Sequence, residues 1–343
     1  MRTFAVAGPW MQDVVGAVVR ARPENVPIAL DGLVLTVREH RRIADDVVTL
    51  TLTREGEPLP AWAPGAHLDL LLPSGRVRQY SLCGDPADRH TYRIAVRRIV
   101  DGGGGSREIH DELSAGMRLW VRGPRNAFPL ALPGRGSGSP SMHFIVGGIG
   151  ITPVLPMVRA ADRAGVEWTM VYSGRTRESM PFRDELARYG SRVVVRSDDL
   201  DGPPAAADLL PADERAAVYC CGPTPMLNPV RAILLDRPGV EFHVERFGPT
   251  PVLGGEAFEV QLARSGPILE IPADRTALEV IRAVRSGTAY SCGQGFCGTC
   301  RVRVLAGVPR HRDTLLTAEQ RAAGQMLLCV SRAAAGTRLV LDI

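Results

Sequence analysis

Four cysteines near the end of the chain have the spacing of an iron–sulfur ligand set. Three lie in the run Cys292-Gly-Gln-Gly-Phe-Cys297-Gly-Thr-Cys300, and Cys329 follows after 28 intervening residues. A tight loop can wrap a small cluster and present three thiolates, while a distant segment supplies the fourth. The three glycines of this loop permit unusual backbone angles and leave amides free to donate to sulfur. The spacing therefore predicts a 2Fe–2S cluster that carries one electron at a time.

Other interpretations of these cysteines fit less well. Structural zinc sites usually pair one C-x2-C with a second C-x2-C or with histidines, whereas here the fourth cysteine stands alone. Four unrelated thiols would leave the placement of the glycines unexplained. A Rieske centre is disfavoured because no histidine closely follows any of the four cysteines.

The composition excludes several other kinds of chemistry. All 41 basic residues are arginine, so the chain has no Schiff-base, pyridoxal phosphate or P-loop lysine. The net charge of +4 is too small to favour nucleic acid or an anionic membrane surface as a partner. No run of 18 apolar residues and no signal-peptide pattern occurs, so we expect a cytoplasmic protein. Seven cysteines in that compartment favour metal or redox chemistry over disulfides.

The elements that must position these residues change in character along the chain. Residues 31–138 contain short apolar runs with a period of two, which favours an antiparallel β-barrel. Strands alternate with helices over 139–248, which indicates a parallel α/β sheet. Residues 256–343 again show alternating strands, with one helix expected over 277–284. Three domains of different architecture therefore fit the chain.

Glycine- and proline-rich segments separate these regions. We expect linkers at 134–140 and 248–256. Residues 1–30 are expected to form an extension of unknown role, in which 10–22 has the pattern of a short amphipathic helix.

The cysteine motif and this domain order resemble the phthalate dioxygenase reductase family, which includes the vanillate demethylase reductases. The resemblance covers about residues 33–343. It implies an FMN-binding barrel, a nicotinamide-binding α/β domain and a C-terminal β-grasp ferredoxin domain, in that order. The activity that it implies is NAD(P)H-dependent electron transfer through flavin and iron–sulfur centres.

A five-residue strand segment, Arg78-Gln79-Tyr80-Ser81-Leu82, resembles the R-x-Y-S-L flavin motif of the ferredoxin-reductase superfamily. Arg78 can neutralise the phosphate or polarise the flavin, and Tyr80 offers a flat face to the ring. The Ser81 hydroxyl can hydrogen-bond near N5, where hydride arrives. The alternative is an edge strand with ordinary side-chain packing.

A run of four glycines, 102–105, precedes Ser106 and a helix expected over 108–113. Such a run presents free amides to a phosphate, with Ser106 as a candidate N-cap and phosphate donor. A flexible hairpin loop is the alternative. The resemblance implies that the FMN phosphate is bound by Gly103, Gly104, Gly105 and Ser106. It assigns to the rest of the flavin the residues Gln79, Ala95, Val96, Arg97, Thr152 and Phe247. For Phe247 the alternative is an ordinary contact at the end of a linker.

Two turns carry the nicotinamide signature. The first contains Gly147, Gly148 and Gly150 between an expected strand and helix, where a pyrophosphate can approach a positive helix end. The second is Cys221-Gly222-Pro223, and in the superfamily such a turn places the cysteine beside the nicotinamide C4.

The remaining cysteines and one carboxylate are assigned by position. Cys220 and Cys83 are expected to be packed strand residues. Glu245 is assigned the role of orienting the nicotinamide or the flavin, from its place at the end of an expected strand.

The choice of coenzyme depends on residues 172–176. The family type has an acidic residue at the position of Thr176, which would bind ribose hydroxyls and repel a 2′-phosphate. Its replacement by threonine, with Arg175 and Arg177 nearby, leaves both NADH and NADPH open, with NADH ahead on family grounds.

Taken together, these motifs predict a step-down in electron number. Hydride carries two electrons and the cluster accepts one, and a flavin can do both. We expect a monomeric reductase component whose partner is a Rieske-type terminal oxygenase or demethylase. The alternatives are a reductase for a haem-thiolate monooxygenase, a stand-alone diaphorase that uses oxygen or small acceptors, and an iron–sulfur sensor without enzymatic activity.

Overall fold

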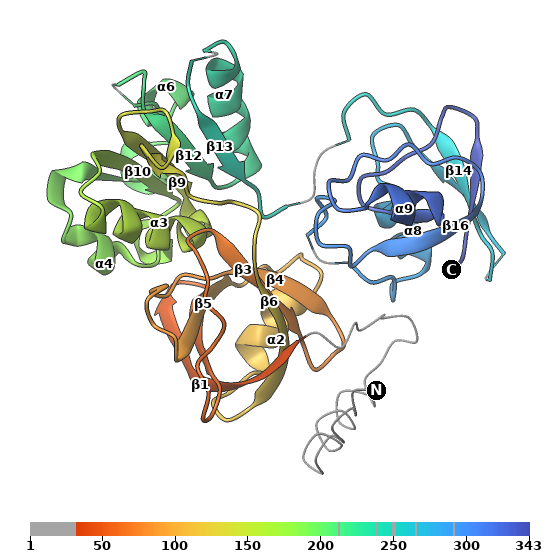
Figure 1. Cartoon of the computed structure of the whole chain (residues 1–343), viewed down its shortest axis with the longest axis horizontal. Coiled ribbons are helices and arrows are strands. Elements are labelled where there is room, and N and C mark those ends of the chain that lie inside the picture. The colour runs from red at the N-terminus through yellow and green to blue at the C-terminus, as the bar shows by residue number, and fades with distance from the viewer. Residues whose placement is uncertain (1–31, 212, 238, 249–251, 265, 291) are drawn as a thin grey trace, which may run out of the picture. The chain divides into compact units, whose positions relative to one another are not determined.

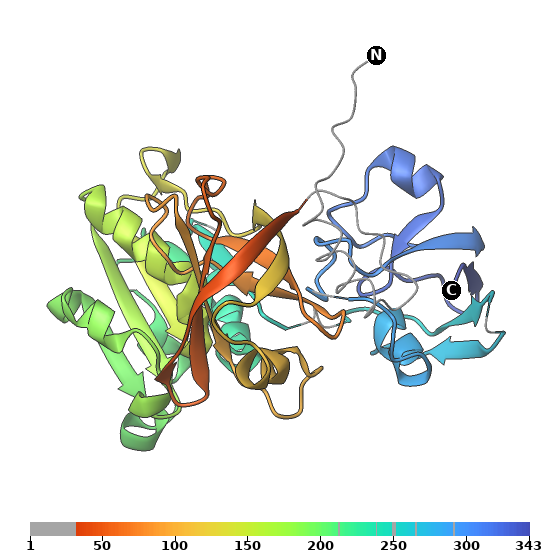
Figure 2. The ribbon, with the colours of Figure 1, turned by 90° about the horizontal axis from the view of Figure 1, so that it is seen from below.

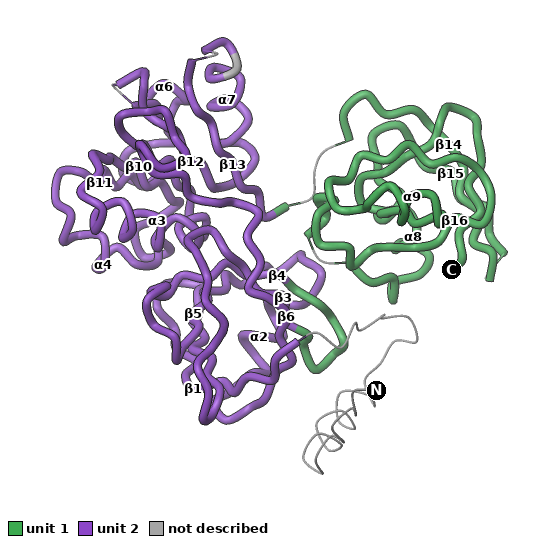
Figure 3. The backbone as a smooth tube through the Cα atoms, viewed as in Figure 1, with its two compact units in different colours: residues 1–31, 71–78, 248–343 green, residues 32–70, 79–247 purple. Residues whose placement is uncertain are grey.

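The computed structural model describes residues 32–343 except 212, 238, 249–251, 265 and 291. Contacts divide the described chain into two units (Figure 3): Gly32–Leu70 with Gln79–Phe247, and Leu71–Arg78 with Gly248–Ile343. The expected extension 1–30, with its amphipathic segment 10–22, lies outside the described residues. Within this described part of the chain, no helix has the length and apolar character needed to cross a membrane.

The first sheet has six strands and curves round on itself as a barrel (Figures 1 and 2). Its order is β4-β3-β6-β1-β2-β5, and β1 pairs antiparallel with both β2 and β6. Short turns suit antiparallel neighbours, as the alternating pattern predicted. The elements of this region are β1 Leu33–Ala44, β2 Val47–Thr53, β3 Ala66–Leu71, β4 Val77–Ser81, β5 Thr91–Arg97, α2 Gly105–Asp111 and β6 Arg118–Asn126.

The second sheet has five strands in the order β11-β10-β9-β12-β13, and its neighbouring strands run parallel. This confirms the α/β prediction. Its elements are β9 Met142–Gly147, η1 Gly148–Gly150, α3 Ile151–Arg163, β10 Trp168–Gly174, η2 Arg177–Ser179, α4 Arg183–Ala187, η3 Gly190–Arg192, β11 Val193–Ser197, α5 Asp198–Asp201, α6 Ala206–Leu209, β12 Ala217–Cys221, α7 Thr224–Leu235 and β13 Phe242–Glu245.

Helices cover both faces of this parallel sheet (Figure 1). Successive side chains of a strand point to opposite faces, so each strand packs against helices on both sides. Phe144 and Val146 of β9 pack with residues of α3, whereas Ile145 between them packs with residues of α6 and α7. The face toward α3 is continuous with the barrel core, since Val47 and Ala95 belong to the same buried cluster. This shared core explains why the two regions form one unit.

The segment expected as a linker at 134–140 is partly structured. Strand β7 (Leu132–Pro133) pairs with β8 (Gly136–Ser137), and the Gly138 amide donates to the Glu241 carboxylate at 2.7 Å. The Tyr219 hydroxyl also accepts a hydrogen bond from the Ala131 amide at 2.8 Å. These tertiary hydrogen bonds fix the position of a segment whose composition had predicted only a linker.

The third sheet, of mixed direction, has the order β15-β14-β18-β16-β17. Its core includes Phe258 and Leu339 together with two of the cysteines. Helix α8 occupies the predicted residues because Thr276 caps it, with a reciprocal bond to Glu279. The elements are β14 Phe258–Leu262, β15 Ile268–Ile271, α8 Ala277–Val284, β16 Arg301–Ala306, α9 Ala318–Ala322, β17 Gln325–Leu327 and β18 Arg338–Leu341.

Candidate redox and cofactor sites

The four cysteines of the C-terminal region are buried and arranged as two pairs. Cys292 and Cys297 are hydrogen-bonded through their thiols, and so are Cys300 and Cys329. All four side chains are at most 8% exposed. Among the described residues, no three histidine, cysteine or carboxylate side chains form a group that could hold one metal ion. Four buried cysteines at this sequence spacing fit the ligand set of a two-iron cluster.

Backbone groups of the loop point at these sulfurs. The Gln294 amide donates to the Cys292 sulfur at 3.3 Å, and Gly295 contributes a backbone hydrogen bond to Cys329. Their shared hydrogen bond lowers the pKa of Cys297 and raises the pKa of Cys292, so without a metal this pair holds one thiolate and one thiol. A bound metal would require both groups as thiolates. The donor set and its amides therefore fit a 2Fe–2S cluster.

The glycines of the loop are required by its conformation. Gly293, Gly295 and Gly298 have φ angles of 66°, 83° and 75°. A Cβ on Gly295 would lie 2.7 Å from a Val330 methyl, and one on Gly298 equally close to Leu315. The expected unusual backbone angles are confirmed.

The two nicotinamide turns, more than 70 residues apart in the sequence, touch each other. A Cβ on Gly150 would lie 2.2 Å from the Cys221 carbonyl oxygen, and one on Gly147 would lie 2.5 Å from Pro223. Neighbouring parallel strands β9 and β12 create this contact, with Val146 opposite Cys221. The carboxyl ends of such strands are where α/β sheets bind ligands.

Cys221 and Glu245 lie opposite each other on β12 and β13 at this same edge. Burial, with the nearby Glu245, raises the pKa of Cys221 well above its ordinary value. Burial also raises the pKa of Glu245 to about 8, so its carboxyl group is protonated at neutral pH. Its Oε2 atom is buried and has no hydrogen-bond partner among the described residues. A neutral carboxyl beside a neutral thiol can donate a hydrogen bond to a carboxamide.

The other two cysteines are packed as expected. Cys83 and Cys220 are fully buried, and burial raises their pKa values to about 11 and about 12. Neither thiol is poised to react at neutral pH.

The residues expected at the adenosine ribose have other interactions. Thr176 caps η2 by accepting a hydrogen bond from the Ser179 amide at 3.3 Å. Arg175 is exposed beside it. Arg97 donates to the Ser179 carbonyl at 2.6 Å, and its Nη1 atom would lie 3.4 Å from a Cβ on Gly148. The structure thus places the head of Arg97, assigned to the flavin, against the first nicotinamide turn.

The flavin motif is supported by a charge cluster that sequence reasoning missed. Asp69 is fully buried and accepts hydrogen bonds from Gln79 at 3.1 Å and from Arg122 and Arg125 at 2.6 and 2.5 Å. The sequence does carry a signal for this cluster, because Asp69 stands between two leucines in an expected strand. A carboxylate buried in such a strand needs positively charged or hydrogen-bonding partners.

The other side chains of the motif also have defined places. Ser81 is 6% exposed, and Tyr80 is half-buried. Arg78, which belongs to the smaller unit, donates to its own neighbour Val77 at 2.9 Å and to the Tyr290 hydroxyl of that unit at 3.2 Å.

The four-glycine loop begins a helix, but not at the expected residue. Helix α2 starts at Gly105 and its N-cap is Gly104, with φ of 81°. The expectation that Ser106 caps this helix is therefore wrong. The Ser106 hydroxyl instead accepts a hydrogen bond from the Ile99 amide at 3.0 Å, which folds the loop back onto the end of the preceding strand.

Two further residues assigned to the flavin lie outside the barrel. The Thr152 hydroxyl is buried at the start of α3 and donates to the Ile149 carbonyl at 3.0 Å. Phe247 is 48% exposed, so it is not packed into the core. Ala95 and Val96 are buried in β5, beside Arg97.

Comparison with known proteins shows what the chain resembles. Residues 260–334 match the family model described as the 2Fe-2S iron-sulfur cluster binding domain. The chain is 37% identical over 319 residues to phthalate dioxygenase reductase of Burkholderia cepacia, covering 90% of this chain and 97% of that protein.

The chain also resembles solved structures. The structure of a phthalate dioxygenase reductase, described as a modular structure for electron transfer from pyridine nucleotides to [2Fe-2S], has a TM-score of 0.67 and 35% identity. It covers 93% of this chain and all of that one. An intact type IV self-sufficient cytochrome P450 monooxygenase has a TM-score of 0.68 and 37% identity, with 94% of this chain matching 43% of that larger one.

Proposed function

The chain belongs to the phthalate dioxygenase reductase family, and from that premise we propose that it supplies electrons to a Rieske-type terminal oxygenase. Members are NAD(P)H-dependent flavin iron–sulfur oxidoreductases that serve as reductase components of multicomponent oxygenase systems. A bound FMN would supply chemistry that can link a two-electron hydride donor to a one-electron cluster. The observation that carries the proposal is the match to a dioxygenase reductase along nearly the whole chain.

We propose that the cluster is held by Cys292, Cys297, Cys300 and Cys329. All four side chains are buried, and Cys300 and Cys329 belong to the core of the third sheet, so water has little access to the sulfurs. The loop amides stabilise thiolate charge. The proposed cluster domain is 256–343, after an FMN domain of 31–138 and a nicotinamide domain of 139–248.

For the nicotinamide we propose the paired turns around Gly150 and Cys221. The glycines let a dinucleotide approach the backbone, and the start of α3 offers amides to its pyrophosphate. The neutral Glu245 carboxyl would orient the carboxamide next to Cys221. Ser81, Cys221 and Glu245 are thus the proposed residues at the site of hydride transfer.

For FMN we propose the motif around Arg78, Tyr80 and Ser81, with the loop from Gly103 to Ser106 at its phosphate. Asp69 holds Gln79 of this motif from the barrel side, so the strand presents its neighbours in a defined direction. Thr152 and Phe247 would approach the flavin from the nicotinamide region.

A haem-thiolate partner is the second candidate, because 94% of this chain matches part of a self-sufficient cytochrome P450. Two parallel electron-transfer assays distinguish the two candidate partners. The NADH-reduced protein is mixed under anaerobic conditions with a purified Rieske oxygenase and, separately, with a haem-thiolate monooxygenase. We expect faster cluster oxidation and product formation with the Rieske protein. Faster transfer to the haem protein would select the second candidate, and transfer only to oxygen or ferricyanide would indicate a diaphorase.

A further inference from the structure

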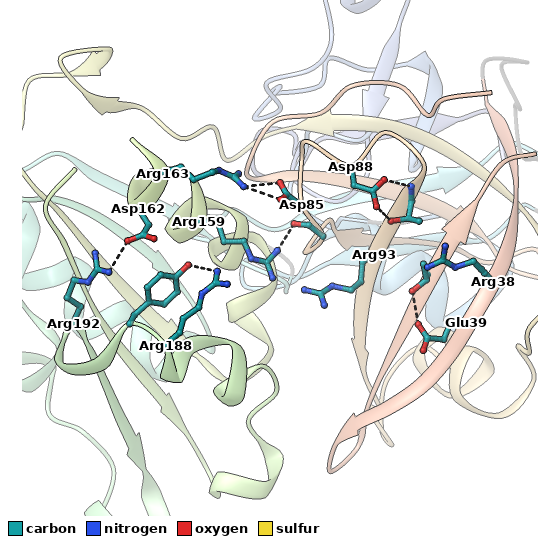
Figure 4. A pocket seen from close by; sticks show the side chains of 14 residues that line it. Arg38, Glu39, Asp85, Asp88, Arg93, Arg159, Asp162, Arg163, Arg188 and Arg192 are labelled. Atoms are coloured by element: carbon teal, nitrogen blue, oxygen red, sulfur yellow. Dashed lines mark hydrogen bonds and ion pairs between the residues drawn. The ribbon is translucent and has the colours of Figure 1, made fainter. Parts of the chain in front are cut away.

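A polar groove of about 850 Å³ opens between the barrel strands and the α/β helices of the larger unit (Figure 4). Its walls carry many arginines, including Arg93 from β5 and Arg159 from α3, whose guanidinium groups point toward one another. Two facing guanidinium groups repel each other unless an anion lies between them.

Glu185 of α4 supplies that anion. Its Oε1 atom accepts a hydrogen bond from Arg93 at 2.9 Å, and its Oε2 atom accepts from Arg93 at 3.2 Å and from Arg159. The side chains of Arg93, Arg159 and Glu185 are 24%, 13% and 33% exposed, so solvent screens this cluster only partly. Burial alone would raise the pKa of Glu185, but hydrogen bonds and charge from both arginines outweigh it and lower that pKa.

The same arginines also bind the backbone just after the flavin motif. The Cys83 carbonyl accepts from Arg93 at 3.0 Å and from Arg159 at 3.3 Å, and the Gly84 carbonyl accepts from Arg159 at 2.9 Å. Cys83 follows Ser81 by two residues. The cluster therefore links the strand that carries Ser81 to the helix that begins at the nicotinamide turn.

The helix that carries Glu185 is itself held in a defined place. Phe182, the residue before α4, has a φ of 65°, which is unusual for a bulky side chain. Its ring lies 5.0 Å from the Arg93 guanidinium. Strained residues persist where surrounding contacts determine them, so α4 is tied to the barrel at this point.

We propose that Glu185 is a positioning residue for hydride transfer, which acts by neutralising Arg93 and Arg159 and so holds the flavin strand against the nicotinamide helix. The proposal rests on the proposed function, in which Ser81 and the turn at Gly150 bind the two reacting cofactors. Hydride transfer is sensitive to distance, and a displacement of about 1 Å can cost about 100-fold in rate.

The test compares full-length protein, loaded with FMN and cluster, as wild type and as Glu185→Gln. The substitution keeps the size of the side chain and removes its charge. We expect flavin reduction by NADH, followed by stopped-flow absorbance and divided by bound FMN, to slow about tenfold or more. Amide hydrogen exchange at 82–84 and in α3 should become faster. The affinity of FMN for the apoprotein, measured by fluorescence titration, should change less than about twofold.

Two variants provide controls. Asp162→Asn removes a carboxylate from the same groove, but Asp162 pairs with Arg192 and both lie in the α/β region, so its rate should equal that of wild type. Glu185→Asp keeps the charge and should restore most of the rate. If Glu185→Gln does not fold, Arg159→Gln takes its place, because it removes one guanidinium group and should slow flavin reduction less severely.

Unchanged flavin reduction in Glu185→Gln would overturn the proposal, as would equal slowing in Asp162→Asn. A rate per FMN that is unchanged while FMN binding is lost would assign the cluster a structural role only, and would also overturn it. These results leave the proposed function intact, because wild type still accepts hydride from NADH. A wild-type protein whose flavin NADH cannot reduce would instead refute the proposed function itself.

Discussion

At the scale of single residues, environment rather than residue type decides which thiols and carboxyls are charged. Cys297 has a lowered pKa because it is hydrogen-bonded to Cys292, whereas burial alone raises the pKa of Cys220. The same contrast separates Glu185, which two arginines keep ionised, from Glu245, which burial keeps protonated.

The first prediction concerns a proposed cluster ligand. Cys297→Ser should lower bound iron and sulfide to a small fraction of the wild-type content and remove the broad visible absorption of the cluster. The flavin bands should remain, because none of the four cysteines is among the residues proposed to bind FMN. Cys220→Ser is the matched control, since Cys220 is buried in the α/β core. Full iron and sulfide content in Cys297→Ser would contradict the ligand assignment.

The second prediction concerns the buried carboxyl of Glu245. In the unfolded chain it releases its proton near its ordinary pKa of 4.5, but in the folded protein it keeps the proton until about pH 8. Between these values the folded state binds more protons, so stability falls as pH rises, by at most about 1.4 kcal/mol per pH unit. Glu245→Gln should remove this pH-dependent loss of folding stability, because glutamine has no proton to release in this range.

Thermal unfolding of the apoprotein at several pH values checks this expectation. The variant should gain stability relative to wild type as pH rises from 5 to 8. Parallel unfolding temperatures for the two proteins across that range would show that Glu245 is ionised in the folded state.

The third prediction concerns coenzyme choice. Arg175 is exposed beside Thr176, at the proposed ribose site, and a guanidinium group can pair with a 2′-phosphate. Arg175→Ala should therefore raise the KM for NADPH about tenfold and leave the KM for NADH nearly unchanged. Steady-state reduction of ferricyanide with each coenzyme measures this difference. Equal changes for both coenzymes would place Arg175 away from the ribose.

At the scale of elements, the most informative feature is the contact between the turn that follows β9 and the turn that follows β12. Each turn contains glycine because the other turn occupies the space where a Cβ would lie. Neither turn is informative alone, since a short glycine motif is common. Their contact is the reason that we propose them as one nicotinamide site.

The fourth prediction tests that contact. Gly150→Ala would place a Cβ 2.2 Å from the Cys221 carbonyl oxygen and force the turns apart. We expect a KM for NADH at least tenfold higher, and a loss of about 1–3 kcal/mol of stability from overpacking. Gly239→Ala is the control, because among the described residues, chain neighbours aside, no heavy atom lies within 4 Å of the position of its Cβ. Normal kinetics for Gly150→Ala would show that the turns do not bind the nicotinamide together.

At the scale of the whole molecule, the distribution of charge predicts how the cluster domain meets its acceptor. Residues 256–343 contain eleven arginines and eight carboxylates, which gives the domain a net charge of +3 without its cluster. This net charge does not favour docking through an acidic face of the kind used by free plant-type ferredoxins.

The fifth prediction follows from this charge. Electron transfer to the true acceptor should change less than about threefold between low and high salt, because few long-range attractions are there to be screened. Stopped-flow oxidation of the reduced cluster by the oxygenase measures it. A fall of tenfold or more with added salt would show that opposite charges steer the encounter.

The sequence alone was sufficient for features that depend on local chemistry. The spacing of Cys292, Cys297 and Cys300 limits the metal that the loop can hold, and Thr276 with Glu279 determines where α8 begins. Period-two and alternating helix–strand patterns identified the kinds of sheet. Such features could be predicted because neighbouring residues determine them.

Other features were decided only by tertiary structure. The contact of Gly150 with Cys221, the protonated state of Glu245, and the neutralisation of Arg93 and Arg159 by Glu185 all join segments far apart in the chain. The same is true of Ser106, whose bond to Ile99 replaced the expected helix cap. Charge states and contacts of this kind arise from burial and from which strands become neighbours, and no local pattern of residues encodes either one.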